Sequence, residues 1–168
     1  MTVDTIKRAL FLVLLVLLQA LVFNHIHIFG FSTPLLYLLL PLSFDSRQKR
    51  WSSLLWCFTL GILTDIFSNT PGMASASMTV LGLLQPPVLR LFIQKDEEVV
   101  VNPSVAAMGW LKYVSYTLLL TLSYSIVFFT LEFLSFHDII LWVSSLGGST
   151  LLTVLILVFI DRIRGGRL

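Results

Sequence analysis

The sequence predicts an all-α integral membrane protein that forms one multi-pass domain, residues 1–168, of six transmembrane helices. Three observations predict this fold class. Hydrophobic residues make up 57% of the chain and charged residues only 12%, with a mean hydropathy of +0.92, whereas a soluble domain usually carries about 25% charged residues. Apolar segments occupy nearly the whole length, which leaves no room for a soluble domain. A six-span interpretation also places all 11 Lys and Arg residues on the same side of the membrane.

The six predicted spans follow from the rule that a membrane-crossing helix needs about 20 mainly apolar residues. No A-x-A-like cleavage site follows the first apolar segment, so we expect a retained span rather than a signal peptide. The second span is short and contains Pro34 and Pro41, which predicts a kinked or re-entrant helix whose broken backbone is buried in protein. Pro86 and Pro87 are expected to end or bend the fourth span near Gln85. In chain order the spans are Ala9–Phe23, Thr33–Phe44, Leu54–Phe67, Met73–Ile93, Met108–Leu134 and Ile139–Ile160.

The basic residues predict the orientation, because cytoplasmic loops of membrane proteins carry the excess of Lys and Arg. They flank the two termini and the connections between spans two and three and between spans four and five. The opposite side holds His25, His27, His137 and Asp138 but no Lys or Arg. Both termini are therefore predicted to be cytoplasmic, and the basic loops could anchor the topology, meet anionic membrane lipid or meet an acidic protein surface. The basic positions are Lys7, Arg8, Arg47, Lys49, Arg50, Arg90, Lys95, Lys112, Arg162, Arg164 and Arg167.

An acidic residue, Asp65, interrupts the end of the third span within the stretch GILTDIFSNTPGMASAS. Gly61 and Asp65 are four residues apart and share one helix face with Cys57. Pro71 suits the first position of the fourth helix, so the free backbone N–H groups of that helix begin close to the carboxylate. We expect Asp65 to accept hydrogen bonds from these groups or from nearby hydroxyls, and so to tie the two helices together. Contact with a partner protein and proton transfer are the alternatives.

A second acidic residue, Glu132, lies near the outer end of the fifth span. Asp65 and Glu132 at similar depth could form an acid–base pair. Alternatively, Glu132 extends its carboxylate to the membrane interface. In the same span, Tyr113 and Tyr116 suit the aromatic belt at the interface.

The segment SSLGGS in the sixth span presents small residues four positions apart, Ser144 with Gly148 and Ser145 with Ser149. Such pairs let two helices approach closely. They predict a packing face that serves either the interior of the bundle or the helix of a partner protein.

Signals for catalysis or metal binding are weak. The sequence contains no G-x-S-x-G, H-E-x-x-H or Gly-rich phosphate loop, so we expect no enzyme, no catalytic residues and no cofactor. His25, His27 and His137 with Asp138 could in principle bind zinc, but alternating loop residues make a poor preorganised site, and we expect no metal. One cysteine excludes an internal disulfide, and a net charge of +2 gives no indication of nucleic-acid binding.

One stretch of the chain reads Gly61-Ile-Leu-Thr-Asp65, followed by Ser68-Asn-Thr-Pro71-Gly72-Met-Ala74. Together with the length of the chain and the number of predicted spans, this stretch resembles the rod shape-determining membrane protein family MreD. The resemblance implies a non-enzymatic scaffold of the bacterial inner membrane that supports peptidoglycan synthesis during cell elongation. It also implies the partners of that family: the coiled-coil protein MreC, the actin-like filament MreB, and the glycosyltransferase RodA with its transpeptidase. Gly61, Asp65, Pro71 and Gly72 would be its structural or partner-binding residues.

The alternative function comes from a similarity of fold, because the MreD family looks like the substrate-binding subunits of energy-coupling-factor transporters. It would be the capture of a small molecule such as a vitamin. Many of those subunits carry an Ala-x-x-x-Ala pair in their first helix. Here Ala9 and Ala20 are too far apart to form one, which argues against the transporter.

Overall fold

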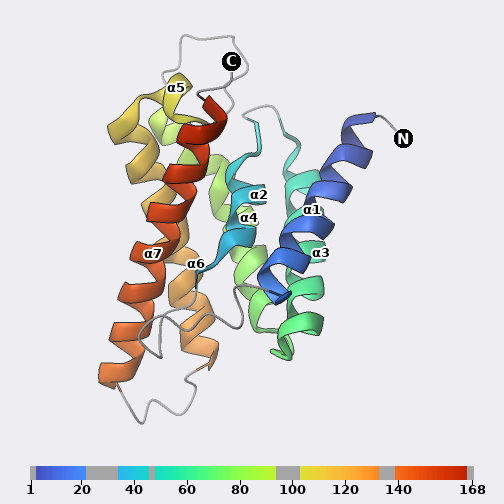
Figure 1. Cartoon of the computed structure of the whole chain (residues 1–168), viewed down its shortest axis with the longest axis vertical. Helices are drawn as coiled ribbons and strands as arrows, with labels where there is room; N and C mark the ends of the chain where they lie inside the picture. The colour runs from blue at the N-terminus through green and yellow to red at the C-terminus, as the bar shows by residue number, and fades with distance from the viewer. Residues whose placement is uncertain (1–2, 22–33, 46–47, 94–102, 133–138, 166–168) are drawn as a thin grey trace.

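The computed structural model describes residues 3–21, 34–45, 48–93, 103–132 and 139–165, and the regular secondary structure in these ranges is helical, as predicted. Five long helices account for most of it, with three short helical segments between them (Figure 1). The elements are α1 Val3–Leu21, η2 Leu36–Leu38, α2 Leu39–Leu42, α3 Arg50–Ser68, α4 Met73–Phe92, α5 Val105–Met108, α6 Trp110–Glu132 and α7 Ile139–Gly165.

The long helices pack as sequence-ordered neighbours around the short segment η2–α2. α1 packs on α3, α3 on α4, α4 on α6 and α6 on α7, while η2 contacts both α1 and α7. α1 and α3 run in the same direction, with the segment η2–α2 returning between them, and α4, α6 and α7 then alternate in direction, so the start of α1 and the end of α7 lie at the same end of the bundle (Figure 1). This arrangement leaves the middle of the bundle to residues 34–44.

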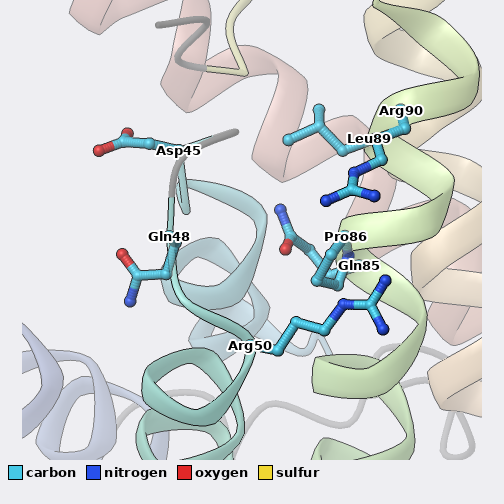
Figure 2. Close-up of a pocket in the computed structure, with 7 residues that line it drawn as sticks. All are labelled: Asp45, Gln48, Arg50, Gln85, Pro86, Leu89 and Arg90. Atoms are coloured by element: carbon cyan, nitrogen blue, oxygen red, sulfur yellow. The ribbon is translucent and has the colours of Figure 1, made fainter.

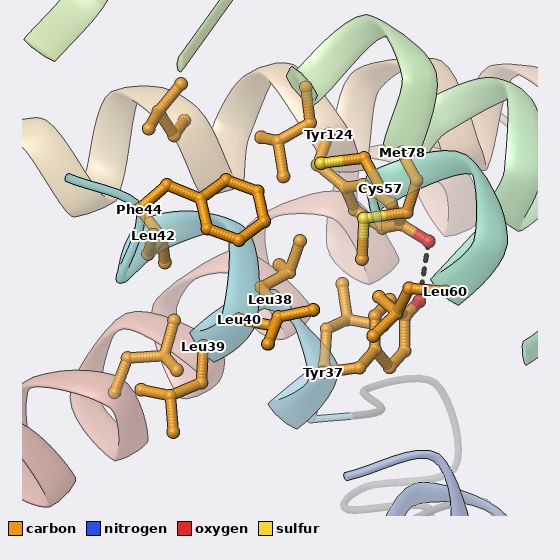
Figure 3. Close-up of a cluster of buried hydrophobic side chains, with 14 of the residues drawn as sticks. Tyr37, Leu38, Leu39, Leu40, Leu42, Phe44, Cys57, Leu60, Met78 and Tyr124 are labelled. Atoms are coloured by element: carbon orange, nitrogen blue, oxygen red, sulfur yellow. Dashed lines mark hydrogen bonds between the residues drawn. The ribbon is translucent and has the colours of Figure 1, made fainter. Parts of the chain in front are cut away.

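The middle segment has the interrupted backbone that its prolines predict. It is buried throughout from Pro34 to Leu42, and it contains one turn of 3₁₀ helix and one turn of α-helix. Figure 3 shows six of its side chains inside the hydrophobic core, among residues of α3, α4 and α6: Tyr37, Leu38, Leu39, Leu40, Leu42 and Phe44. A broken helix is tolerated at membrane depth only when protein surrounds it, and here four long helices supply partners for it, as described below.

Three helices, α3, α6 and α7, are long and apolar enough to cross a membrane. This indicates a membrane protein. α1 contains a shorter apolar stretch, Arg8–Gln19, and α4 has sufficient length but mixes Ser, Thr, Gln and Pro among its apolar residues. The structure therefore supports three of the six predicted crossings by length and composition.

The prolines of α4 do not end the helix, so of the two expected outcomes, an end or a bend near Gln85, the end is wrong. α4 continues through Pro86 and Pro87 to Phe92. A proline removes one backbone donor but keeps a helical φ angle. Val88 and Leu89 are buried at 7% and 2% exposure, so packing of the last turns on the core holds them in helical form.

The basic residues gather at one end of the bundle, as the sequence predicts. The starts of α1, α3 and α6 and the ends of α4 and α7 share the upper end in Figure 1. Contacts join these segments, since Arg8 pairs with Asp45 at 3.5 Å and the Arg162 guanidinium lies 5.3 Å from the centre of the Trp110 ring. We call this end the basic end. It carries every Lys and Arg of the described ranges: Lys7, Arg8, Lys49, Arg50, Arg90, Lys112, Arg162 and Arg164.

Candidate functional site

The α3–α4 corner, at the end opposite the basic end, contains the predicted hydrogen-bond tie. Asp65 is 8% exposed. Its Oδ1 accepts hydrogen bonds from the Ala74 N–H at 2.9 Å and from the Thr70 hydroxyl at 3.0 Å, and its Oδ2 accepts one from the Ser75 N–H at 2.9 Å. Helix N-termini leave backbone donors without intrahelical partners and carry partial positive charge. The carboxylate therefore caps α4 from the neighbouring helix, and the predicted tie is confirmed.

A close approach of the two backbones makes this geometry possible. A Cβ atom added to Gly61 would lie 2.5 Å from the Ser75 Cα and 3.0 Å from the Ala74 carbonyl oxygen. Such contacts cannot be relieved by rotating a side chain, because the atoms belong to the α4 backbone. Gly61 thus allows the first turn of α4 to sit directly on α3, one helical turn before Asp65 on the same face.

The turn between the helices requires two residues with positive φ. Asn69 ends α3 with φ 55° and Gly72 precedes α4 with φ 84°. Glycine adopts such a φ without steric cost, and asparagine tolerates it better than most residues. The chain therefore reverses within four residues and returns the α4 start to the Asp65 carboxylate.

Pro71 does not occupy the first helical position, which corrects the sequence prediction. α4 begins at Met73 with Gly72 as its cap, so Pro71 lies exposed in the turn. The left-handed φ of Gly72 delays the helix by two residues beyond the position that proline preference suggests. Pro71 restricts the turn and has no described contact with Asp65.

Glu132 lies exposed at the last position of α6. Within the described part of the chain, no hydrogen bond or ion pair joins Glu132 to Asp65, and the three bonds of Asp65 come from α4 and the preceding turn. The structure therefore does not bring the two acids together as a hydrogen-bonded pair.

The small residues of α7 divide between two environments. Ser145 and Ser149 are buried at 3% and 0% exposure, so this pair packs inside the bundle. Ser144 and Gly148 are half-buried, and the Ser144 hydroxyl donates to the Leu141 carbonyl of its own helix at 3.0 Å. The Ser144–Gly148 face is therefore the one that remains accessible to another helix.

A second set of polar contacts, not identified from the sequence, holds the middle segment. Gln19 is 2% exposed; its amide donates to the Pro34 carbonyl at 2.9 Å and its carbonyl accepts the Leu36 N–H at 3.0 Å. The Leu35 N–H donates to the Thr153 hydroxyl at 3.1 Å. These backbone groups lack helical partners at the broken start of the segment, so α1 and α7 replace the bonds that a regular helix would have made.

The other contacts of the middle segment come from α4 and α6. The Gln85 amide donates to the Phe44 carbonyl at 3.2 Å and to the Tyr116 hydroxyl at 3.1 Å. The Tyr37 and Tyr124 hydroxyls share a hydrogen bond, drawn in Figure 3, with the two rings edge to face. Tyr116 is fully buried, so its expected place at the membrane interface is wrong. Tyr113 is also buried, at 3% exposure. Isolated Gln residues in apolar spans were the sequence signal for this network.

Within the described ranges, no group of three His, Cys, Asp or Glu residues could hold a metal ion. His25, His27, His137 and Asp138 lie outside the described residues. Asp65, the buried carboxylate, is surrounded by donors that fix it as a hydrogen-bond acceptor.

Comparison of the chain with models of known protein families, with curated proteins and with solved structures yields no match.

Proposed function

We propose that this chain is a non-enzymatic scaffold of the bacterial inner membrane, with six membrane-crossing segments and both termini cytoplasmic. It would support peptidoglycan synthesis in the cell-elongation machinery, as members of the MreD family do, by binding an MreC-like coiled-coil protein. MreB-like filaments and a RodA-like glycosyltransferase with its transpeptidase would be further members of the complex.

The observation that carries the proposal is the structural role of the Gly61–Asp65 stretch, on which the resemblance to MreD rests. All three described hydrogen bonds of the carboxylate go to the α4 start and the preceding turn. The stretch therefore builds a rigid helix corner rather than a reactive group. A scaffold needs fixed helix faces for its partners, whereas an enzyme needs a group that can exchange protons or bonds.

The experiment is an affinity isolation of the tagged chain from cross-linked native membranes in mild detergent, followed by mass spectrometry. We expect a single-pass coiled-coil protein and wall-synthesis enzymes to accompany the wild-type chain and the matched variant Gly147→Ala, since nothing lies within 4 Å of a Cβ added at Gly147. Asp65→Ala should reduce their recovery. Recovery of an ATPase pair with a membrane coupling subunit instead would establish the transporter alternative.

A further inference from the structure

A pocket at the basic end lies between the residues preceding α3 and the last two turns of α4 (Figure 2). Arg50 begins α3, and its side chain reaches across toward α4. Gln85, Leu89 and Arg90 come from α4 and point into the gap from the other side. Two guanidinium groups therefore approach the same space from two helices, with Gln85 and Pro86 between them in this view.

The charge of this pocket is positive because its acidic residue is occupied elsewhere. The Asp45 carboxylate turns away from the gap in Figure 2 and pairs with Arg8 at 3.5 Å. Neither Arg50 nor Arg90 forms an ion pair or hydrogen bond with another described residue. Both side chains are exposed, so they are available to an anion that enters the gap.

The floor of the pocket is closed by contacts already made. The Gln85 amide is held by the Phe44 carbonyl and the Tyr116 hydroxyl, and Leu89 is 2% exposed. The pocket thus has a fixed floor, and the two exposed arginines stand at its rim. Guanidinium groups suit phosphate oxygens because their planar N–H donors match two oxygens at once.

The neighbouring surface indicates a lipid rather than a free anion. Trp51 and Leu91, each next in sequence to one of the two arginines, are 86% and 79% exposed. In a membrane protein such side chains at a helix end contact the acyl chains and the interface. A phospholipid whose phosphate is held by the two arginines, and whose acyl chains lie along this apolar surface, would use both the positive pocket and the exposed apolar side chains.

We propose that the pocket between Arg50 and Arg90 binds the phosphate headgroup of an anionic phospholipid at the basic end of the bundle. This inference goes beyond the scaffold function. It requires only that the bundle spans a membrane with this end at a headgroup layer.

The test uses the purified full-length chain in detergent, titrated with dioleoylphosphatidylglycerol or with dioleoylphosphatidylcholine of the same acyl chains, and read by native mass spectrometry. The variant is Arg50→Gln with Arg90→Gln. The matched control is Lys112→Gln with Arg162→Gln, which removes the same charge from the same end but outside the pocket. A third variant, Arg50→Lys with Arg90→Lys, keeps the charge and removes the guanidinium geometry. Thermal unfolding of each variant shows whether it is folded.

We expect the wild-type chain to prefer the anionic lipid, and the double glutamine variant to bind it at least about tenfold more weakly, which corresponds to about 1.4 kcal/mol. The control should stay within about threefold of wild type, about 0.7 kcal/mol, and the double lysine variant should fall between the two. An equal loss in variant and control would mean general attraction of a basic surface and would overturn the proposal. Displacement of the lipid by excess inorganic phosphate would show an anion site without lipid selectivity, which also contradicts it.

Discussion

Replacing Asp65 by alanine tests the role of the α3–α4 corner most directly. The change removes the acceptor of two backbone N–H groups, those of Ala74 and Ser75, and of the Thr70 hydroxyl. It leaves the packing at Gly61 in place, so the effect measures the electrostatic part of the corner alone.

The magnitude follows from the three bonds. A hydrogen bond to a charged group contributes about 1.5–3 kcal/mol to stability, and a carboxylate at a helix N-terminus adds about 0.3–1 kcal/mol. These contributions do not add fully, because the exposed turn at Pro71 and Gly72 lets water reach the freed donors. We expect Asp65→Ala to lower the free energy of unfolding by about 3 kcal/mol.

The assay is reversible unfolding in mixed micelles with increasing dodecyl sulfate, followed by circular dichroism. Asp65→Asn should lose about half as much stability, since its amide oxygen can still accept from two of the three donors. Glu132→Gln is the control, an exposed acid on α6, and should change stability by less than about 0.5 kcal/mol. If Asp65→Ala costs no more than Glu132→Gln, the carboxylate does not hold the corner.

Three other substitutions test other contacts. Gly61→Ala should destabilise the bundle by about 1–3 kcal/mol, because its Cβ meets the α4 backbone and overpacking has this cost. The control Gly147→Ala has free space around its Cβ and should be neutral or stabilising in the same unfolding assay. Equal effects of the two substitutions would contradict the close approach of α3 and α4. Gln19→Leu should lower the free energy of unfolding by about 2 kcal/mol or more, since it leaves two buried backbone groups of the middle segment unpaired. A loss of less than about 0.5 kcal/mol, which is the usual effect of a surface substitution, would be inconsistent with this network. Ser144→Leu should reduce recovery of the coiled-coil partner in the affinity isolation without altering the stability of the chain. The control Ser115→Leu, on the exposed face of α6, should leave that recovery unchanged. Identical recoveries for the two variants would exclude the Ser144–Gly148 face as the docking surface.

The α3–α4 corner could be predicted from the sequence because its causes are local. The acceptor and its backbone donors are only nine and ten residues apart, and a helix start always presents free N–H groups. The first residue of α4 was harder to predict, because the φ angle of Gly72 rather than the ring of Pro71 decides where the helix begins.

The supports of the middle segment were beyond prediction for the opposite reason. Leu35 and Thr153 are 118 residues apart, and no local pattern relates them. The two prolines predict a broken backbone that needs partners, but not which helices provide them. For the same reason Tyr116 was placed at the interface: its amphipathic side chain suits that position, and only the packing of α4 on α6 encloses it.

The middle segment also sets the order in which the protein can be completed. α3 and α4 can close their corner as soon as residue 75 has emerged, because every bonding group of that corner is already present. The Leu35 N–H, in contrast, gains its hydroxyl partner only after Thr153 in α7 has been synthesised. The second segment to be made therefore waits for the last one, and an unfinished chain exposes an unpaired backbone at its centre during that interval. The final helix therefore supplies the last of the partners that the broken start of the middle segment requires.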